Sequence, residues 1–188
     1  MTVTIRLLGR PAVERDGRPV RAPRGRKAWA LLCYLLLADR PPGRRHLAEL
    51  LFADAADPLG ALRWTLAELR RVLGTDLFKG DPVDHTLPPG YEVDLQSENG
   101  DLLEGITIDA AFDAWLLVER LRVAAAIEAR LRAAATAALA ANRPGDAVPH
   151  AARAVARNPL EQGNHELLVR ALAMTGDRAA AERQVASC

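Results

Sequence analysis

Arginine side chains gather in the short segment ALRWTLAELRRVLG, residues 61–74, at spacings that suit contact with a polyanion. Arg63, Arg70 and Arg71 lie there beside Trp64 and Glu68. Four leucines of the segment recur at helical spacing and predict one buried stripe, formed by Leu62, Leu66, Leu69 and Leu73. The opposite face must then meet water, another protein or a nucleic acid.

Charge is distributed unevenly along the 188 residues, although the net charge is only +1. Residues 1–75 hold 14 Lys or Arg against 7 Asp or Glu, residues 76–97 hold 1 against 5, and residues 98–188 hold 10 against 12. Only the first segment can neutralise several phosphates at once, so a polyanion partner is expected there. The alternative is an arginine-rich surface that serves solubility alone.

Catalytic and metal-binding patterns are absent from the sequence. It contains no phosphate-binding GxxxxGK[ST] loop, no GxGxxG, no HExxH and no GxSxG. The four histidines have no ligand spacing, and the pair His46 and Glu49 on one helical face is more typical of a solvated surface. The sequence predicts no enzyme, no catalytic residue, no metal site and no cofactor.

Composition predicts a soluble globular protein, since 49% of residues are hydrophobic and 26% are charged. The apolar run AWALLCYLLLA at 28–38 is well short of the roughly 20 residues that cross a bilayer, and no signal peptide is recognisable. Cys33 and Cys188 give no disulfide framework. These features predict a cytoplasmic protein without a membrane partner.

The first half of the chain predicts a small antiparallel sheet followed by helices. Strands are expected at 3–8 and 12–15, with Asp16-Gly17 as a hairpin turn. A helix from Arg26 must end at the cluster 40–43, which is rich in proline and glycine, and a second helix follows at about 45–52.

A third helix and a hairpin complete this expected unit. Asp57 and Pro58 are suited to a helix start, and Gly74 to its end, so the third helix should span 58–73. Residues 76–95 contain two turn clusters between short β-prone pieces and predict a hairpin. A helix with arginines at its edges fits the major groove of DNA, and a hairpin wing can lie along the backbone.

The second half predicts helices only. Beyond a polar junction at 96–105, one long helix or two should occupy 110–142. The side chains expected in the core of this segment are Phe112, Trp115, Leu116, Leu121, Ile127 and Leu131. Two weakly similar copies follow, whose Gly145-Asp146 and Gly176-Asp177 pairs suggest a tetratricopeptide-like array. The chain ends without a helix cap, which predicts a fragment of a longer protein.

Taken together, residues 26–74 and the segment TLPPGYEVDL resemble the OmpR-type winged helix found in SARP-type transcriptional activators. The part from GDLLEG to GDRAAAERQ resembles the bacterial transcriptional activator domain of the same family. The predicted fold is thus an α+β winged helix with a small antiparallel sheet, three helices and a C-terminal hairpin, at 1–97. A truncated all-α, tetratricopeptide-like domain follows at 98–188.

The resemblance implies a transcriptional regulator that binds promoter DNA, with 58–73 in the major groove and the wing 76–95 along the backbone. It also implies a homodimer on DNA, and a helical domain that serves dimerisation or contacts RNA polymerase subunits. Gly60 and Ala61 would face the groove. The predicted DNA-binding residues are Arg63, Trp64, Thr65, Glu68, Arg70, Arg71, Lys27, Arg44, Arg45, His85 and Thr86.

Two departures from the family keep an alternative open. OmpR-type domains commonly have an arginine in place of Glu68, and a basic wing residue in place of Asp84 or Thr86. A carboxylate on the groove face repels phosphate, although it can accept a hydrogen bond from cytosine. The alternative is a protein-interaction module whose winged helix no longer binds DNA. Trp64 itself either contacts a base or sugar in the groove or packs, partly buried, against the wing, and packing is favoured. Either function is compatible with the regulatory front of a longer ATP-binding regulator.

Overall fold

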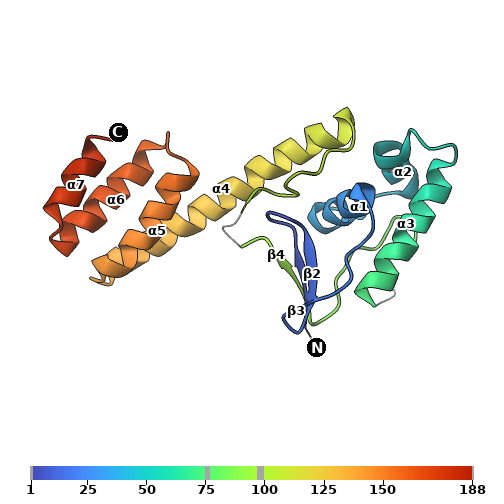
Figure 1. Ribbon diagram of the computed structural model, residues 1–188, viewed down its shortest axis with the longest axis horizontal. Helices are drawn as coiled ribbons and strands as arrows, with labels where there is room; N and C mark the ends of the chain where they lie inside the picture. The colour runs from blue at the N-terminus through green and yellow to red at the C-terminus, as the bar shows by residue number, and fades with distance from the viewer. Residues whose placement is uncertain (1, 75–76, 97–99, 188) are drawn as a thin grey trace. The chain divides into compact units, whose positions relative to one another are not determined.

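The computed structural model describes residues 2–74, 77–96 and 100–187, which form two compact units, 1–121 and 122–188 (Figure 1). The first unit holds a sheet and the helices α1 to α3, and the second is helical. The long helix α4 (Ala110–Ala140) contributes its first part to one unit and its remainder to the other. The boundary predicted at residue 97 stays a prediction, while the compact first unit continues to Leu121.

The sheet of the first unit is mixed. Its strands are β1 (Val3–Arg6), β2 (Ala12–Arg15), β3 (Arg18–Pro19) and β4 (Tyr91–Asp94), in the order β3-β2-β1-β4. β1 pairs antiparallel with β2, whereas β4 pairs parallel with β1, with Ile5 opposite Val93. The predicted strands at 3–8 and 12–15 are found, but the sheet is not purely antiparallel.

The hairpin predicted at 76–95 is absent from the described residues 77–95, which contribute the single strand β4. The physical reason lies in the prolines. Pro82, Pro88 and Pro89 cannot donate to a strand ladder, so the chain crosses this region as turns and extended segments until Tyr91. The wing is therefore a loop.

Three helices pack beside this sheet: α1 (Arg26–Leu37), α2 (Arg44–Phe52) and α3 (Pro58–Leu73). Their bounds agree with the three predicted helices. The apolar core joins the sheet to all three, and its fully buried side chains include Ile5, Leu7, Leu31, Leu32, Leu35, Leu47, Leu51, Leu62, Leu66 and Leu69. This core holds α3 with one face inward, as the leucine spacing predicted.

Residues 101–121 also belong to the first unit. The backbone N–H of Leu103 donates to the carbonyl of Leu7, and the Arg120 guanidinium donates to the carbonyls of Leu102 and Leu103 at 2.8 and 3.0 Å. Phe112 and Leu116 are buried, as predicted. Leu121 was expected in the core but is 64% exposed, because it lies on the opposite side of the helix from Leu116 and Val123.

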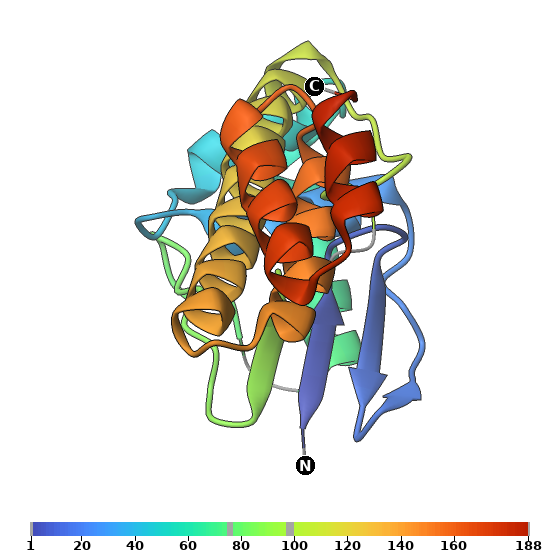
Figure 2. The same cartoon turned by 90° about the vertical axis from the view of Figure 1, so that its left-hand side faces the viewer.

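The second unit is an array of antiparallel helices built on small side chains. α5 (Pro144–Arg157), α6 (Gln162–Thr175) and α7 (Arg178–Val185) lie side by side (Figure 2). Alanines dominate the shared core, which consists of Ala135, Ala138, Leu139, Ala147, Ala151, Leu168 and Ala171. Small residues allow the helix axes to approach closely. Within the described residues, no helix is long and apolar enough to cross a membrane.

Candidate nucleic-acid interface

The start of α3 is set by Asp57. Its side chain accepts a hydrogen bond from the backbone N–H of Gly60 at 2.8 Å, while Pro58 occupies the first helical turn. A Cβ at Gly60 would lie 2.2 Å from a carboxylate oxygen of Asp57, so a larger residue would require the Asp57 side chain to shift from this capping position. Gly60 was predicted as a groove-facing residue, and the structure gives it this structural role at the helix N-terminus.

One side of α3 is exposed and carries apolar and arginine side chains. We call it the outer face of α3; it consists of Leu59, Arg63, Trp64, Ala67 and Arg71. Trp64 is 63% exposed, so it does not pack into the wing. Arg63 is also largely exposed, and its guanidinium lies 3.8 Å from the Asp57 carboxylate.

Two residues predicted to face the groove are instead buried. Thr65 is 4% exposed and its hydroxyl donates to the Ala61 carbonyl at 2.8 Å, while Glu68 is 8% exposed. Thr65 and Glu68 lie on α3 at the edge of the leucine stripe, where the packing of α1 against α3 covers them. Sequence periodicity alone does not define how wide the buried stripe is.

Glu68 is neutralised within the protein. Arg71 donates from Nε at 3.0 Å and from Nη2 at 2.7 Å to the Glu68 carboxylate. The side-chain hydrogen bonds from Arg71, aided by the backbone N–H of Arg24, hold the pKa of Glu68 below its usual value. The carboxylate that argued against phosphate binding therefore carries its own counter-charge, and Arg71 is positioned at the edge of the outer face.

Arg70 has a different role from its neighbours. Its Nε donates to the carbonyl of Leu77, and its Nη2 to that of Phe78, both at 2.7 Å. These bonds connect the last turn of α3 to the loop that follows. Arg70 was predicted to lie near phosphates, but in the structure its N–H groups donate to the carbonyls of this loop.

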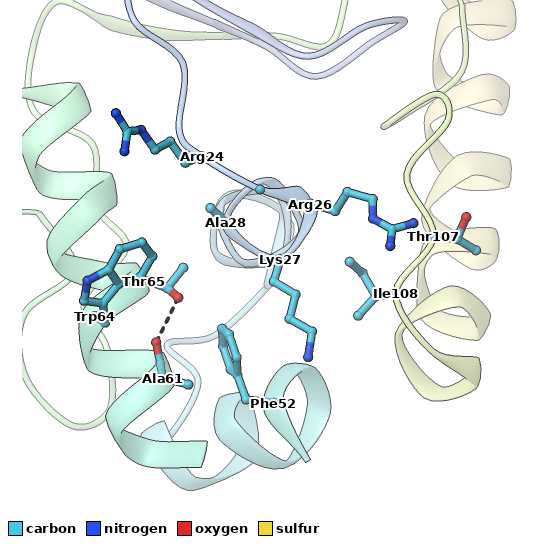
Figure 3. A pocket seen from close by; sticks show the side chains of 11 residues that line it. Arg24, Arg26, Lys27, Ala28, Phe52, Ala61, Trp64, Thr65, Thr107 and Ile108 are labelled. Carbon is cyan, nitrogen blue, oxygen red and sulfur yellow. Dashed lines mark hydrogen bonds between the residues drawn. The ribbon is translucent and has the colours of Figure 1, made fainter. Parts of the chain in front are cut away.

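A depression of about 400 Å³ lies on one flank of α3, next to the start of α1. Trp64, Thr65 and Ala61 of α3 line it on one side, and Thr107 and Ile108 line it on the opposite side (Figure 3). Between them lie the residues at the start of α1: Arg24 on the side of Trp64, Lys27, and Arg26 pointing toward Thr107. The ammonium group of Lys27 already has partners, since it pairs with Asp54 and lies 5.4 Å from the Phe52 ring centroid. Arg24 and Arg26 are exposed and form no ion pair within the described part of the chain.

A second depression of about 380 Å³ lies on the other flank of α3. It is lined by Arg44 and Arg45 of α2, by Asp81, and by Leu59, Leu62 and Arg63 of α3. Arg44 donates from Nε to the Gly80 carbonyl at 2.8 Å, and Arg45 pairs with Glu49 at 2.8 Å. The Arg45 side chain stays 90% exposed. Cationic side chains thus border the outer face of α3 on both flanks.

The predicted wing residues lie in the loop before β4. Thr86 is exposed, while His85 is half-buried and its Nδ1 has no hydrogen-bond partner among the described residues. Asp84 accepts from the backbone N–H of Thr86 at 2.9 Å, and hydrogen bonds from Thr86 lower the pKa of Asp84. Tyr91 anchors the end of this loop, because its hydroxyl donates to the Leu73 carbonyl of α3 at 2.7 Å.

Sequence reasoning missed Arg24 and Arg26. The signal was present in PRGRK at 23–27, a basic cluster immediately before a helix start, but only the packing of α1 beside α3 brings it to the outer face. Among the described residues, no group of three or more His, Cys, Asp or Glu side chains is placed to hold a metal ion.

Comparison with known proteins gives a family match and a similar solved structure. Residues 99–188 match the bacterial transcriptional activator domain, a family of transcriptional activators rather than enzymes. The fold is similar to that of EmbR from Mycobacterium tuberculosis, solved in complex with a low-affinity phosphopeptide. The TM-score is 0.68 at 16% identity, and the match covers 97% of this chain and 57% of the EmbR chain. This chain therefore spans little more than half the length of that protein. No curated protein matches the chain. The fold class predicted from the sequence is confirmed.

Proposed function

We propose that this chain regulates transcription by binding double-stranded promoter DNA through α3. Its family match and its fold confirm the resemblance to SARP-type transcriptional activators. The observation that carries the proposal is the arrangement of charge around the outer face of α3. Arg24 and Arg26 border one flank, and Arg44 and Arg45 border the other. A helix lying in the major groove has phosphates on both sides, so cations on both flanks are what such docking requires.

Each flank has arginines with donors available for phosphate. Arg24 and Arg26 are exposed, and the side chains of Arg63 and Arg45 are 68% and 90% exposed. Arg45 can exchange its surface partner Glu49 for a phosphate at little cost, since ion pairs between exposed side chains contribute little to stability. Thr86 and the exposed edge of His85 extend the contact along the backbone, and Lys27 contributes charge beside the first depression.

The helical unit would serve a second task, either dimerisation on DNA or contact with RNA polymerase. Its surface exposes large apolar side chains, including Leu160 at 94% and Val185 at 59%. Such residues favour contact with protein over contact with DNA. The protein would act in the cytoplasm, where its DNA is found.

Binding to random genomic duplex fragments at two salt concentrations tests the proposal. If about 4 to 6 phosphates are neutralised per protomer, log affinity should fall against log salt with a slope of roughly −4 to −5. The variant Arg24→Ala/Arg26→Ala/Arg63→Ala should lose most of the retention, and its slope should be shallower by about 3.

A matched variant controls for the loss of three charges. Arg10→Ala/Arg18→Ala/Arg170→Ala removes the same charge from exposed positions that do not line either depression. It should bind duplex nearly as the unchanged protein does. If the unchanged protein retains no duplex at low salt, the proposal is wrong and the protein-interaction module is favoured. Equal losses in both variants would mean that net charge, not the outer face of α3, holds DNA.

A further inference from the structure

We propose that the outer face of α3 selects thymine and guanine, with Trp64 contacting the thymine C5-methyl group and Arg63 and Arg71 contacting guanine. This inference rests on the proposed DNA binding and adds the chemistry of the bases that are read. It follows from which side chains of α3 the fold leaves exposed.

The side chains of α3 that could accept hydrogen bonds are already engaged. Thr65 is buried and bonded to the Ala61 carbonyl, and the Glu68 carboxylate is occupied by Arg71. Asp57, at the helix start, accepts from Gly60 and lies beside Arg63. The outer face itself, from Leu59 to Arg71, therefore offers no side-chain acceptor to the exocyclic amino group of a base; the exposed Asp57 carboxylate lies beyond it, at the helix start.

The exposed side chains offer two kinds of contact. Trp64 at 63% exposure, Leu59 at 48% and the exposed Ala67 present apolar surface. Arg63 and Arg71 have side chains that are 68% and 49% exposed, and guanidinium groups only donate. Arg71 uses Nε and Nη2 in its pair with Glu68, so its Nη1 is the group that would meet a base. The face thus combines apolar surface with donors.

In the major groove, these two chemistries match two bases. Guanine presents the acceptors N7 and O6, which a guanidinium can contact with two hydrogen bonds, and thymine presents a methyl group that favours apolar contact. Cytosine presents only an amino donor, which needs an acceptor from the protein; adenine pairs such a donor with its N7 acceptor, so a guanidinium can make one hydrogen bond to adenine but two to guanine. Trp64 lies midway along the exposed length of α3, one helical turn from Ala67 and two from Arg71.

The test begins with selection of duplexes by the full chain from a pool of random sequence. The selected duplex is then made with uracil in place of each thymine in turn, which removes only the C5-methyl group. At one or more positions the unchanged protein should bind about fourfold more weakly, the fold-change expected for one buried methyl group. Trp64→Ala should bind the thymine and uracil duplexes equally.

Arginine contacts are tested in the same duplex with 7-deazaguanine, which lacks the N7 acceptor. Replacement at a contacted guanine should weaken binding by the unchanged protein about tenfold, and Arg63→Ala or Arg71→Ala should abolish that difference. Leu117→Ala is the matched control for Trp64→Ala, because Leu117 of α4 is an apolar residue at 57% exposure that lines neither depression. It should discriminate thymine from uracil as the unchanged protein does.

Failure of this inference is distinguishable from failure of DNA binding. Salt-sensitive binding that is indifferent to uracil at every position, or a uracil effect that persists in Trp64→Ala, would overturn base selection by Trp64 and leave the DNA-binding proposal standing. Absence of any retained duplex would overturn both.

Discussion

The guanidinium of Arg70 lies 2.7 Å from the carbonyl oxygen of Phe78, and a second bond of equal length reaches the carbonyl of Leu77. Leu77 and Phe78 are buried, at 7% and 1% exposure. Arg70 therefore connects the end of α3 to the loop that leads to β4, and its charge is used inside the first unit.

Replacing Arg70 by alanine should destabilise the first unit by about 2 kcal/mol, because two buried carbonyls lose a charged donor. All three tryptophans, Trp29, Trp64 and Trp115, lie in this unit, so tryptophan fluorescence during urea unfolding reports on it alone. Lys27→Ala is the comparison variant, and its loss of unfolding free energy should be smaller, because the ion pair of Lys27 with Asp54 is exposed. An unchanged urea midpoint for Arg70→Ala would contradict the anchoring role.

The Glu68–Arg71 pair should make the first unit sensitive to acid. The pKa of Glu68 is lowered from its ordinary value of 4.5 by Arg71, so the pair stabilises the fold above that value. This contribution is lost as pH falls through the lowered pKa of the folded state. Glu68→Gln should be less stable than the unchanged protein at neutral pH, and the difference should shrink below pH 4.5.

Urea unfolding followed by tryptophan fluorescence across this pH range measures the effect. Glu49→Gln is the matched control, since Glu49 also pairs with an arginine but both side chains are mainly exposed. Its stability should follow that of the unchanged protein at every pH. A constant difference between Glu68→Gln and the unchanged protein would show that the carboxylate charge does not contribute.

Gly74→Ala should lower the stability of the first unit by about 1 kcal/mol, since an L residue in the left-handed conformation is strained. Gly74 ends α3 at φ 72°, and its N–H donates to the Arg70 carbonyl at 2.9 Å. The melting temperature measured by tryptophan fluorescence checks this. Gly145→Ala in α5 is the opposite case, because an added Cβ meets nothing within 4 Å, and it should be neutral or stabilising. Circular dichroism at the helical band measures this change, since the second unit holds no tryptophan. A neutral Gly74→Ala would contradict the assigned conformation.

Asn164 should be essential to the second unit. It is fully buried, and its Nδ2 donates to Glu128 of α4 at 2.9 Å and to the Ala154 carbonyl of α5 at 3.2 Å. Asn164→Leu keeps the volume but removes these donors, and should cost about 2–3 kcal/mol. Circular dichroism at the helical band should show an earlier thermal transition, while the tryptophan transition of the first unit stays in place.

Gln162→Ala is the control for this change, because Gln162 bonds to Glu166 on an exposed surface of the same helix. It should leave the helical transition nearly unchanged. Loss of the tryptophan transition in Asn164→Leu would mean that the two units do not unfold separately.

The Cys33 thiol should be unreactive in the folded protein. It is fully buried in α1, and desolvation, reinforced by the charge of Glu119, raises its pKa far above the ordinary value of a thiol. In a Cys188→Ser variant, a thiol reagent at mildly alkaline pH should label the chain only after urea is added. Rapid labelling without urea would contradict the burial of α1.

Local sequence determined the helices of the first unit. Asp57, Pro58 and Gly74 specify the ends of α3, because capping and backbone conformation depend on residues that are close in the chain. The leucine spacing likewise predicted which side of α3 is buried. The family match and the fold confirmed the resemblance that these elements together suggested.

Tertiary structure alone decided the features that depend on residues distant in the chain. The parallel pairing of β4 with β1 joins Tyr91 to Val3, and no local pattern specifies a partner so far away. Leu121 is exposed although Leu116 and Val123 of the same helix are buried, because packing, not composition, selects the covered face.

The outer face of α3 shows the same division within one helix. Sequence placed Arg63, Trp64, Thr65, Glu68, Arg70 and Arg71 in this segment, but their roles depend on what packs beside them. Thr65 and Glu68 are buried, and Arg70 donates to the loop carbonyls of Leu77 and Phe78. Arg24 and Arg26, just before α1 and at its start, line the depression beside α3. Helical periodicity predicts the direction in which a side chain points. Only the surrounding fold determines which neighbours that side chain contacts and which of its hydrogen bonds are already made.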